Sequence, residues 1–172
     1  FFYAPLVITG LHHMFLAVDF QLMGSSLKGT YLWPIVAISN ICQGSAAFGA
    51  WLIYKRRKMA KEEGLALTSG VSAFLGVTEP AMFGVNLPLK VPFFAAICTS
   101  GILGAVIGAN RVLGNVGVGG VPAFISIQSK YWSIYIPVIL LAMILPAVLT
   151  VVFSKFTKVK AKEMIENPDD IK

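Results

Sequence analysis

The sequence predicts an all-α integral membrane protein, and three observations support this class. Of the 172 residues, 56% are hydrophobic and only 13% are charged, and the mean hydropathy is +0.77. The apolar residues fall in runs of about 20, the length that a helix needs to cross a bilayer. Lysine and arginine gather at the ends of these runs, which is how membrane proteins encode their orientation.

The charge distribution argues against a nucleic-acid partner. The net charge is +6, but the cations do not interleave with polar and aromatic side chains as they would on a nucleic-acid interface. No basic segment precedes a short apolar run and a small-residue cleavage site, so we expect no signal peptide. Because the first residue is Phe1, we expect the chain to be a piece of a longer polypeptide.

The cysteines and histidines predict no metal site and no cofactor. Cys42 and Cys98 lie in apolar runs without other ligands at metal-binding spacing, so we expect buried, unreactive thiols. His12 and His13 are adjacent and therefore do not share a helix face, and no third ligand follows them. A serine hydrolase is not supported either, because the sequence has no Gly-x-Ser-x-Gly elbow.

The first 60 residues predict one interrupted apolar segment and one complete span. Residues 1–23 are apolar except for four polar side chains, and a Gly/Ser turn follows. Residues 31–54 have the length of a complete span. Within it, Asn40 and Gln43 belong to a patch of small and polar residues that forms interhelical hydrogen bonds or contacts a ligand. The basic cluster that begins at Lys55 places the end of this span on the cytoplasmic side.

Residues 64–89 predict a re-entrant hairpin. The segment is rich in Gly, Ser and Thr and contains two prolines and Glu79, so it is too interrupted for a clean span. We expect residues 65–75 to descend, residues 76–80 to form the tip and residues 81–89 to return. Irregular backbone at membrane depth is tolerated only where protein buries it or where it lines a cavity.

Two further spans are predicted at residues 91–112 and 133–153. Gly101, Gly104 and Gly108 share one face of the first, which favours close helix packing. The Gly-rich residues 114–128 lack the strand and helix that flank a phosphate-binding loop, so we expect a bent, cavity-facing or re-entrant connection. After it, an aromatic belt is predicted at Tyr131, Trp132 and Tyr135.

The positions of the cations agree with this topology. We divide the chain into a membrane domain, residues 1–154, and a polar cytoplasmic tail, residues 155–172. With a hairpin at residues 64–89, both basic clusters lie on the cytoplasmic side. A complete crossing there would leave the lysines of the tail outside, unless residues 114–128 contain a second crossing.

Glu79 is the residue that points most directly to function. Six of the eight carboxylates lie in two solvated segments, and only Asp19 and Glu79 have apolar neighbours. A carboxylate at membrane depth costs several kcal/mol unless it lines a polar cavity or finds a partner. Pro80 and the flanking glycines break the helix here, as at transporter binding sites. The alternative is a structural carboxylate that accepts hydrogen bonds from the backbone of a broken helix.

Polar side chains in three segments predict a hydrophilic cavity for a neutral ligand rich in hydroxyl groups. A carboxylate accepts two hydroxyl hydrogen bonds, and a neutral imidazole donates one and accepts another. Phe15, Trp33 and Phe83 offer faces for stacking on a sugar ring, unless they face lipid or pack in the core. The candidate binding residues are His12, His13, Asp19, Gln21, Asn40, Gln43, Thr78, Glu79 and Asn86. We assign no catalytic residue within the chain.

Five motifs follow one another along the chain. They are Ile8-Thr9-Gly10-Leu11-His12-His13, Leu32-Trp33-Pro34, and residues 39–46, 76–87 and 117–128. In this order they resemble the membrane component (domain IIC) of bacterial phosphotransferase-system sugar permeases in the glucose superfamily, over nearly the whole chain up to about Phe153. Residues 17–22 and the ending Ser126-Ile127-Gln128 are most similar to the trehalose and sucrose branch, with trehalose the nearer.

The resemblance implies a site and a mechanism. In the family, the Glu of the Thr-Glu-Pro hairpin binds sugar hydroxyls, which maps to Glu79, and a His of the Gly-x-His-His segment lies at the substrate, which maps to His12 or His13. Domain IIC holds the sugar while a partner IIB domain, which carries a phosphocysteine and works with IIA, phosphorylates it from the cytoplasm. Family members are homodimers whose sugar-binding domain moves in an elevator-like fashion.

The resemblance also implies a location and a role for this chain. The chain corresponds to the C-terminal, substrate-binding part of a multi-pass permease in the lipid of the bacterial inner membrane, without the N-terminal spans of the dimer scaffold. It would be the membrane-bound component of a protein-phosphocysteine–sugar phosphotransferase, with the donor cysteine elsewhere.

The residues alone also fit an ion-coupled sugar or metabolite carrier with Glu79 and His13 as a proton relay, or a membrane scaffold or sugar sensor.

Overall fold

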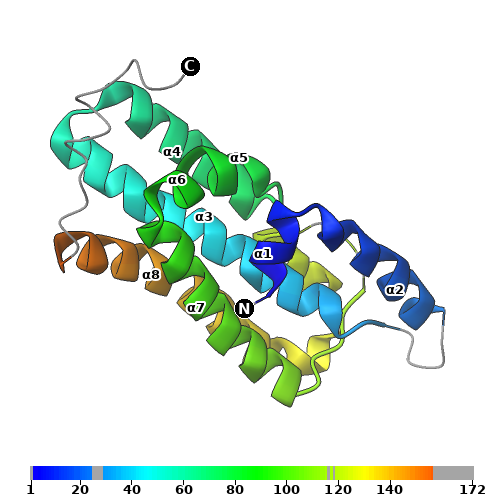
Figure 1. Ribbon diagram of the computed structural model, residues 1–172. Coiled ribbons are helices and arrows are strands. Elements are labelled where there is room, and N and C mark those ends of the chain that lie inside the picture. The colour runs from blue at the N-terminus through cyan, green and yellow to red at the C-terminus, as the bar shows by residue number, and fades with distance from the viewer. Residues whose placement is uncertain (1, 25–28, 116, 118, 157–172) are drawn as a thin grey trace.

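The computed structural model describes residues 2–24, 29–115, 117 and 119–156, and its backbone is helical with short irregular connections (Figure 1). Only isolated β-bridges, and no strand, occur in these residues. Three helices are long and apolar enough to cross a membrane: α3 (Leu32–Arg57), α7 (Val91–Ala109) and α8 (Trp132–Phe156). The all-α class is therefore confirmed, and helices long enough to cross a membrane lie at the three predicted spans, with small shifts at the helix ends.

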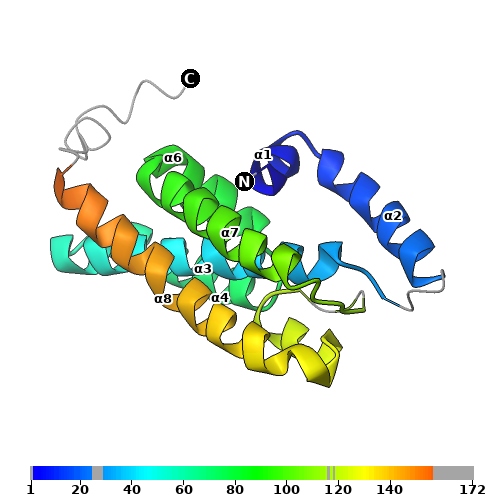
Figure 2. The same cartoon turned by 90° about the horizontal axis from the view of Figure 1, so that it is seen from below.

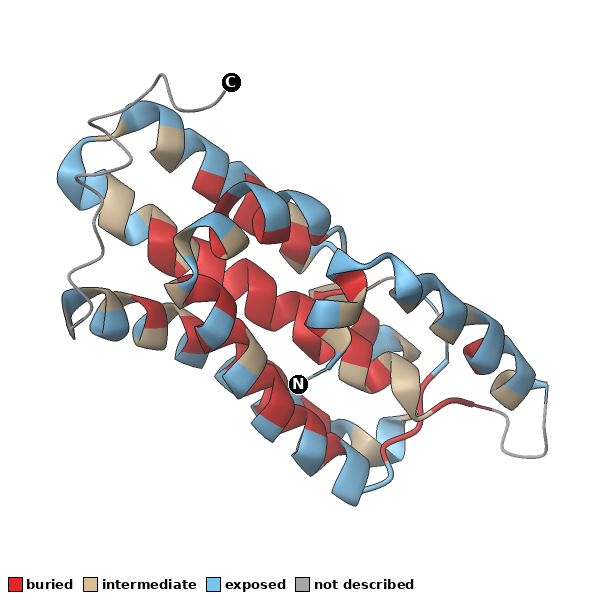
Figure 3. Ribbon diagram, viewed as in Figure 1, coloured by how far each residue is buried: buried red, intermediate tan, exposed pale blue. Residues whose placement is uncertain are grey.

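Helix α3 forms the centre of the molecule and is buried along most of its length (Figure 3). Its small residues allow this burial, because they let neighbouring helices approach closely. A Cβ on Gly44 would lie 2.7 Å from the ring of Phe74 in α4, and one on Gly49 would lie 2.8 Å from the carbonyl oxygen of Ala147 in α8. The predicted glycine face of α7 packs against α3 as well, where Gly104 meets Ile35.

A helical hairpin follows α3. It consists of α4 (Ala60–Phe74), a turn, and a second arm made of α5 (Glu79–Ala81), η2 (Met82–Asn86) and α6 (Leu87–Leu89). The hairpin returns to the end of α3 from which it left, because Leu89, Val91 and Arg57 line one pocket. The 15 residues of α4 extend about 22 Å at 1.5 Å per residue, so the tip stops beside α3 instead of passing its far end.

The segment η2 is a turn of π-helix directly after the hairpin tip. In a π-turn the backbone hydrogen bonds span five residues instead of the four of an α-helix, and such turns are frequent at functional sites. Here it lies against α3 and carries Asn86 into the core, where the side chain is fully buried.

The N-terminal helices lie to one side of this bundle (Figure 2). They are α1 (Tyr3–Ile8), η1 (Leu11–His13) and α2 (Met14–Met23). The hydroxyl of Thr30 donates a hydrogen bond to Asp19 of α2 and accepts one, at 3.0 Å, from the backbone N–H of Leu32. This chain of hydrogen bonds connects α2 to the first turn of α3.

The Gly-rich residues 114–128 form a bent connection, as predicted, with short turns at η3 (Val121–Ser126) and η4 (Ser129–Tyr131). The described part of this connection contains no second crossing helix. At its start, Gly114 exchanges two backbone hydrogen bonds with Thr30, at 2.8 and 3.1 Å. Farther along, Gly119 and Gly120 return to the hairpin tip.

Two predictions about single side chains are wrong. Tyr135 does not belong to an aromatic belt, because it is completely buried and its hydroxyl donates a hydrogen bond to the carbonyl oxygen of Pro34, at 3.2 Å. Cys98 is exposed on α7, whereas Cys42 is buried as expected. Helices α7 and α8 are apolar on all sides, so periodicity could not tell which face meets the bundle. The predicted tail, residues 155–172, lies outside the described residues from residue 157 onward.

Candidate functional site

A cavity of about 170 Å³ lies where the N-terminal helices, α3 and the hairpin tip meet. Six of the nine predicted binding residues line it, and they come from parts of the sequence up to 67 positions apart. These residues are His12, His13, Asp19, Asn40, Thr78 and Glu79. The fold therefore brings together the polar groups that the sequence places in separate apolar segments.

Close backbone contacts hold the hairpin tip in place. Gly76 has a φ of +107° and Gly120 a φ of +66°, a region that side-chain-bearing residues rarely occupy. A Cβ on Gly76 would lie 2.9 Å from the backbone of Gly119, and one on Gly120 would collide with the carbonyl oxygen of Phe74. The tip and the Gly-rich connection fit together because these glycines lack side chains.

The tip places Glu79 at the first position of α5, where Pro80 follows it. Glu79 is exposed toward the cavity, and its carboxylate accepts no hydrogen bond from any described residue. This observation disfavours a structural carboxylate bound by backbone N–H groups. Thr78, the residue before it, is 5% exposed and also lines the cavity.

The histidine pair and Tyr3 line the same cavity. The rings of His12 and His13 lie 4.0 Å apart, and Tyr3 meets His12 edge-on at 6.3 Å. Burial lowers the pKa of His12, and the neighbouring His13 lowers that pKa further. Burial, with the charges of Glu79 and Asp19, raises the pKa of Tyr3 to about 12. At neutral pH the cavity thus contains a neutral imidazole and a phenol that keeps its proton.

Two buried ring nitrogens of the cavity lack a hydrogen-bond partner among the described residues. They are Nδ1 of His12 and Nε1 of the Trp33 indole. A buried polar group without a hydrogen bond is costly, so an unpaired group that faces a cavity is suited to a ligand. Phe15 lines the same cavity, whereas Phe83 is 44% exposed and does not.

Asp19 has a structural contact in addition to its place in the cavity. It is 1% exposed and accepts the hydrogen bond from Thr30 described above. Asn40 has a weaker contact of the same kind, since its Nδ2 lies 3.5 Å from the carbonyl oxygen of Gly76. Both residues therefore help to shape the cavity as well as line it.

Three predicted binding residues lie outside the cavity. Gln21 is exposed on α2. Gln43 and Asn86 bind each other in the core, where Nδ2 of Asn86 donates to the carbonyl oxygen of Gln43 at 2.9 Å and to its Oε1 at 2.7 Å. For Gln43 the structure therefore favours interhelical hydrogen bonding, which the sequence left open.

Sequence reasoning missed Tyr3, Gly76 and Gly119 as cavity residues. Tyr3 is one aromatic residue in an apolar run, and nothing in its neighbourhood distinguishes it from a packing residue. The two glycines line the cavity with backbone, and their positions depend on the contact between the hairpin tip and the connection after α7.

The cavity offers one carboxylate that has no partner in the described part of the chain, two imidazoles, an indole N–H group, a hydroxyl, an amide and aromatic faces. This set is suited to a neutral polyhydroxyl compound, because sugars combine hydrogen-bonding edges with apolar ring faces. In the described residues, no three His, Cys, Asp or Glu side chains come together as they would around a metal ion.

Comparison with known proteins agrees with this chemistry. The family described as "Phosphotransferase system, EIIC" matches residues 1–101. The trehalose-specific EIIBC component of Bacillus subtilis (strain 168) is 51% identical over 156 residues, which cover 90% of this chain and 33% of that protein. No solved structure matches.

Two other relatives have similar coverage. The trehalose-specific EIIBC component of Escherichia coli (strain K12) is 46% identical over 151 residues, 87% of this chain and 31% of the relative. The sucrose-specific EIIBC component of Staphylococcus xylosus is 50% identical over 138 residues, 77% of this chain and 28% of the relative. The chain thus spans about a third of the length of the curated relatives it matches, and it belongs to the EIIC family of the phosphotransferase system.

Proposed function

We propose that this chain forms the sugar-binding part of a permease that takes up a disaccharide, trehalose or sucrose, and phosphorylates it during uptake. The observation that carries the proposal is the cavity at the hairpin tip, which is lined by the His12–His13 pair and by Glu79, whose carboxylate has no partner among the described residues. Relatives named as trehalose- and sucrose-specific EIIBC components support the substrate class. Trehalose is our first choice, because the trehalose-specific relative of Bacillus subtilis is 51% identical over 90% of the chain, whereas the sucrose-specific relative of Staphylococcus xylosus is 50% identical over 77%.

In this proposal the cavity binds the sugar by its hydroxyl groups. Glu79 accepts hydrogen bonds from two hydroxyls, His12 or His13 donates one, and the indole N–H of Trp33 donates another. Asp19, Asn40 and Thr78 complete the polar lining. The cavity of about 170 Å³ is smaller than a common ligand pocket of about 300–1,000 Å³, so we assign the rest of the disaccharide site to other segments of a complete permease.

The phosphoryl group comes from a phosphocysteine of a IIB domain, which in turn is phosphorylated by IIA. The hydroxyl oxygen of the sugar attacks phosphorus in line, the P–S bond breaks as the P–O bond forms, and the hydroxyl proton leaves so that the donor returns as a thiol. The chain contributes by positioning the hydroxyl, since positioning supplies much of the rate of such transfers. The charged product is repelled by Glu79, which favours its release.

The arrangement in the membrane is part of the proposal. The basic cluster at the end of α3 lies on the cytoplasmic side of the bacterial inner membrane. The hairpin of α4 to α6 is re-entrant, because it leaves and returns at that side and α4 is shorter than the hydrocarbon core of about 30 Å. Residues 1–154 form the membrane domain and residues 155–172 a cytoplasmic tail. The complete permease is a homodimer through segments outside this chain, and its sugar-binding part moves as an elevator.

Uptake by membrane vesicles tests the proposal. Vesicles that contain the complete permease and its phosphotransfer partners are given labelled trehalose, and the internal label is separated into free sugar and phosphate ester. We expect a phosphate ester whose formation requires the phosphocysteine domain. Free sugar that accumulates with a proton gradient would establish the ion-coupled carrier instead, and binding without uptake would establish a sensor.

A further inference from the structure

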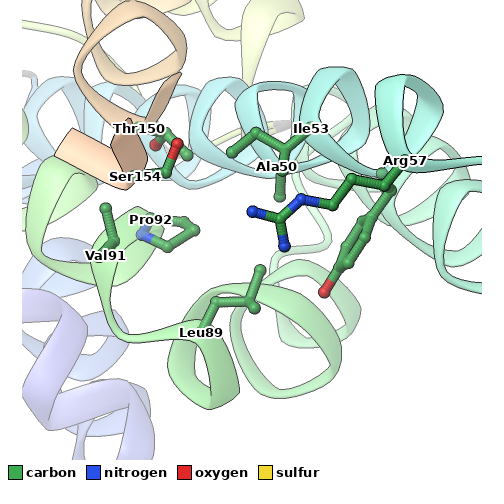
Figure 4. A pocket seen from close by; sticks show the side chains of 9 residues that line it. Ala50, Ile53, Arg57, Leu89, Val91, Pro92, Thr150 and Ser154 are labelled. Carbon is green, nitrogen blue, oxygen red and sulfur yellow. The ribbon is translucent and has the colours of Figure 1, made fainter. Parts of the chain in front are cut away.

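A second site lies at the opposite end of the bundle from the sugar cavity, where α3 and α8 end and α7 begins. A pocket between these helices is lined by nine residues (Figure 4). They are Ala50, Ile53, Tyr54, Arg57, Leu89, Val91, Pro92, Thr150 and Ser154. A second hollow adjoins it and shares three of these residues, and it adds Arg56, Val151 and Lys155.

Three cations border the two hollows: Arg56, Arg57 and Lys155. None of them forms an ion pair with a described residue. Lys55 differs, because its ammonium group lies 4.9 Å from the centre of the Trp51 ring. In Figure 4 the guanidinium of Arg57 extends from α3 into the middle of the pocket.

Two hydroxyl-bearing residues of α8, Thr150 and Ser154, line the pocket across from this guanidinium (Figure 4). The Ser154 hydroxyl donates a hydrogen bond to the carbonyl oxygen of Val151, at 2.9 Å. Thr150 is completely buried, and its Oγ1 has no hydrogen-bond partner among the described residues. A buried hydroxyl without a partner is unfavourable, and helical threonines ordinarily avoid it by bonding to the preceding turn. The hydroxyl of Thr150 is therefore available to donate a hydrogen bond to a ligand in the pocket.

An apolar groove continues from the pocket along α7 and α8. It shares Val91 with the pocket and has a volume of about 260 Å³. Its other residues are all apolar or weakly polar: Phe94, Ala95, Cys98, Leu149 and Phe153. From Val91 to Cys98 the groove follows two turns of α7, about 10 Å along the helix axis.

We infer that this end of the bundle binds an anionic phospholipid. The phosphodiester lies between Arg57 and the hydroxyl of Thr150, with Arg56 and Lys155 beside it, and one acyl chain lies in the groove between α7 and α8. A free phosphate ion would use the cations but not the groove, and a protein partner would not enter an apolar groove that runs along membrane-spanning helices. Basic pockets between such helices at the cytoplasmic side are suited to anionic headgroups.

Lipid titration of the complete permease tests this inference. The permease in nanodiscs or mild detergent is titrated with phosphatidylglycerol and with phosphatidylcholine, and bound lipid is counted by native mass spectrometry. We expect at least fivefold tighter binding of phosphatidylglycerol by the unchanged protein. Arg57→Gln is expected to abolish this preference while Lys58→Gln, which removes a neighbouring exposed charge outside the pocket, leaves it intact.

Thr150→Val supplies a second readout that does not depend on a charge. Valine has the shape of threonine without the unpaired hydroxyl, so the variant is expected to have a higher Tm than the unchanged protein in phosphatidylcholine. When phosphatidylglycerol replaces phosphatidylcholine, the Tm of the variant should rise less than the Tm of the unchanged protein, because bound lipid stabilises the fold by mass action.

Three results would overturn the inference. Arg57→Gln and Lys58→Gln could lower the phosphatidylglycerol preference equally, which would indicate diffuse surface charge. Inorganic phosphate at millimolar concentration could abolish the preference for phosphatidylglycerol, which would indicate a free-anion site. Arg57→Gln could impair only phosphotransfer from the IIB domain with lipid binding unchanged, which would indicate a protein-docking surface. Trehalose binding by each variant shows whether the sugar site itself remains folded.

Discussion

Two tryptophans of α3, Trp33 and Trp51, have buried indole N–H groups that find no hydrogen-bond partner among the described residues. Trp33 lines the cavity at the hairpin tip and Trp51 does not. The pair therefore allows a ligand contact to be separated from a simple packing role, because the same substitution can be made at both positions.

Trp33→Phe is expected to weaken trehalose binding by about three- to tenfold, the value of one net hydrogen bond of about 0.5–1.5 kcal/mol. Trp51→Phe removes the same N–H outside the cavity and should leave the Kd unchanged. Isothermal titration of the complete permease measures both. Equal Kd values for Trp33→Phe and the unchanged protein would remove Trp33 from the site.

The Gln43–Asn86 pair has a different role from the cavity residues, a role that the sequence left open for Gln43 and did not predict for Asn86. Asn86→Leu leaves Oε1 of Gln43 buried without its donor, so we expect a loss of about 1–3 kcal/mol of stability and a lower Tm, with the Kd for sugar of the folded protein within about twofold. Asn110→Leu is the control for an exposed position: it removes the hydrogen bond of 2.8 Å from Nδ2 to the carbonyl oxygen of Val106, but water can replace the lost partner there, so its loss of stability should be smaller. A Kd that rises without a loss of Tm would return Asn86 to the binding site.

At the scale of elements, the contact between the hairpin tip and the Gly-rich connection controls the shape of the cavity. Gly120→Ala places a Cβ against the carbonyl oxygen of Phe74 at a φ of +66°, so the two segments must separate. We expect the variant to lose most of its trehalose binding and at least about 1 kcal/mol of stability.

Gly64→Ala is the matched control for that substitution. Gly64 lies within α4 and a Cβ there meets no atom within 4 Å. Alanine in a helix interior is favoured over glycine by about 0.8–1 kcal/mol, so this variant should be as stable as the unchanged protein or more so, with the same Kd. If Gly120→Ala binds sugar normally, the tip does not depend on this contact.

The sequence predicts the elements better than their contacts. Apolar runs and basic ends predicted the three long apolar helices, and Pro80 with the glycines around Glu79 predicted the hairpin tip. Gly120 and Phe74 are in contact although they lie 46 positions apart in the sequence, and no local sequence pattern predicts such a contact. Gln43 and Glu79 are both polar residues in apolar surroundings, and only the three-dimensional structure separates a core hydrogen bond from a cavity group.

At the scale of the whole molecule, the chain leaves α3 and enters α7 at the same end. In a variant without native cysteines, Lys58→Cys and Lys90→Cys are therefore expected to react with a membrane-impermeant maleimide from the cytoplasmic side, and Asn110→Cys from the other side. Labelling of intact cells and of inside-out vesicles gives the two exposures. If residues 58 and 90 react from opposite sides, the hairpin is a complete crossing and the proposed topology is wrong.

The central claim is that the sugar binds at the cavity through the carboxylate of Glu79, and the most direct measurement is trehalose affinity of the complete permease with Glu79→Gln. The account predicts a Kd raised at least about tenfold, or 1.4 kcal/mol, because the amide accepts fewer and weaker hydrogen bonds from the hydroxyls. Glu63→Gln, which removes a carboxylate of α4 outside the cavity, should leave the Kd unchanged. Normal trehalose affinity and uptake with Glu79→Gln would contradict the account.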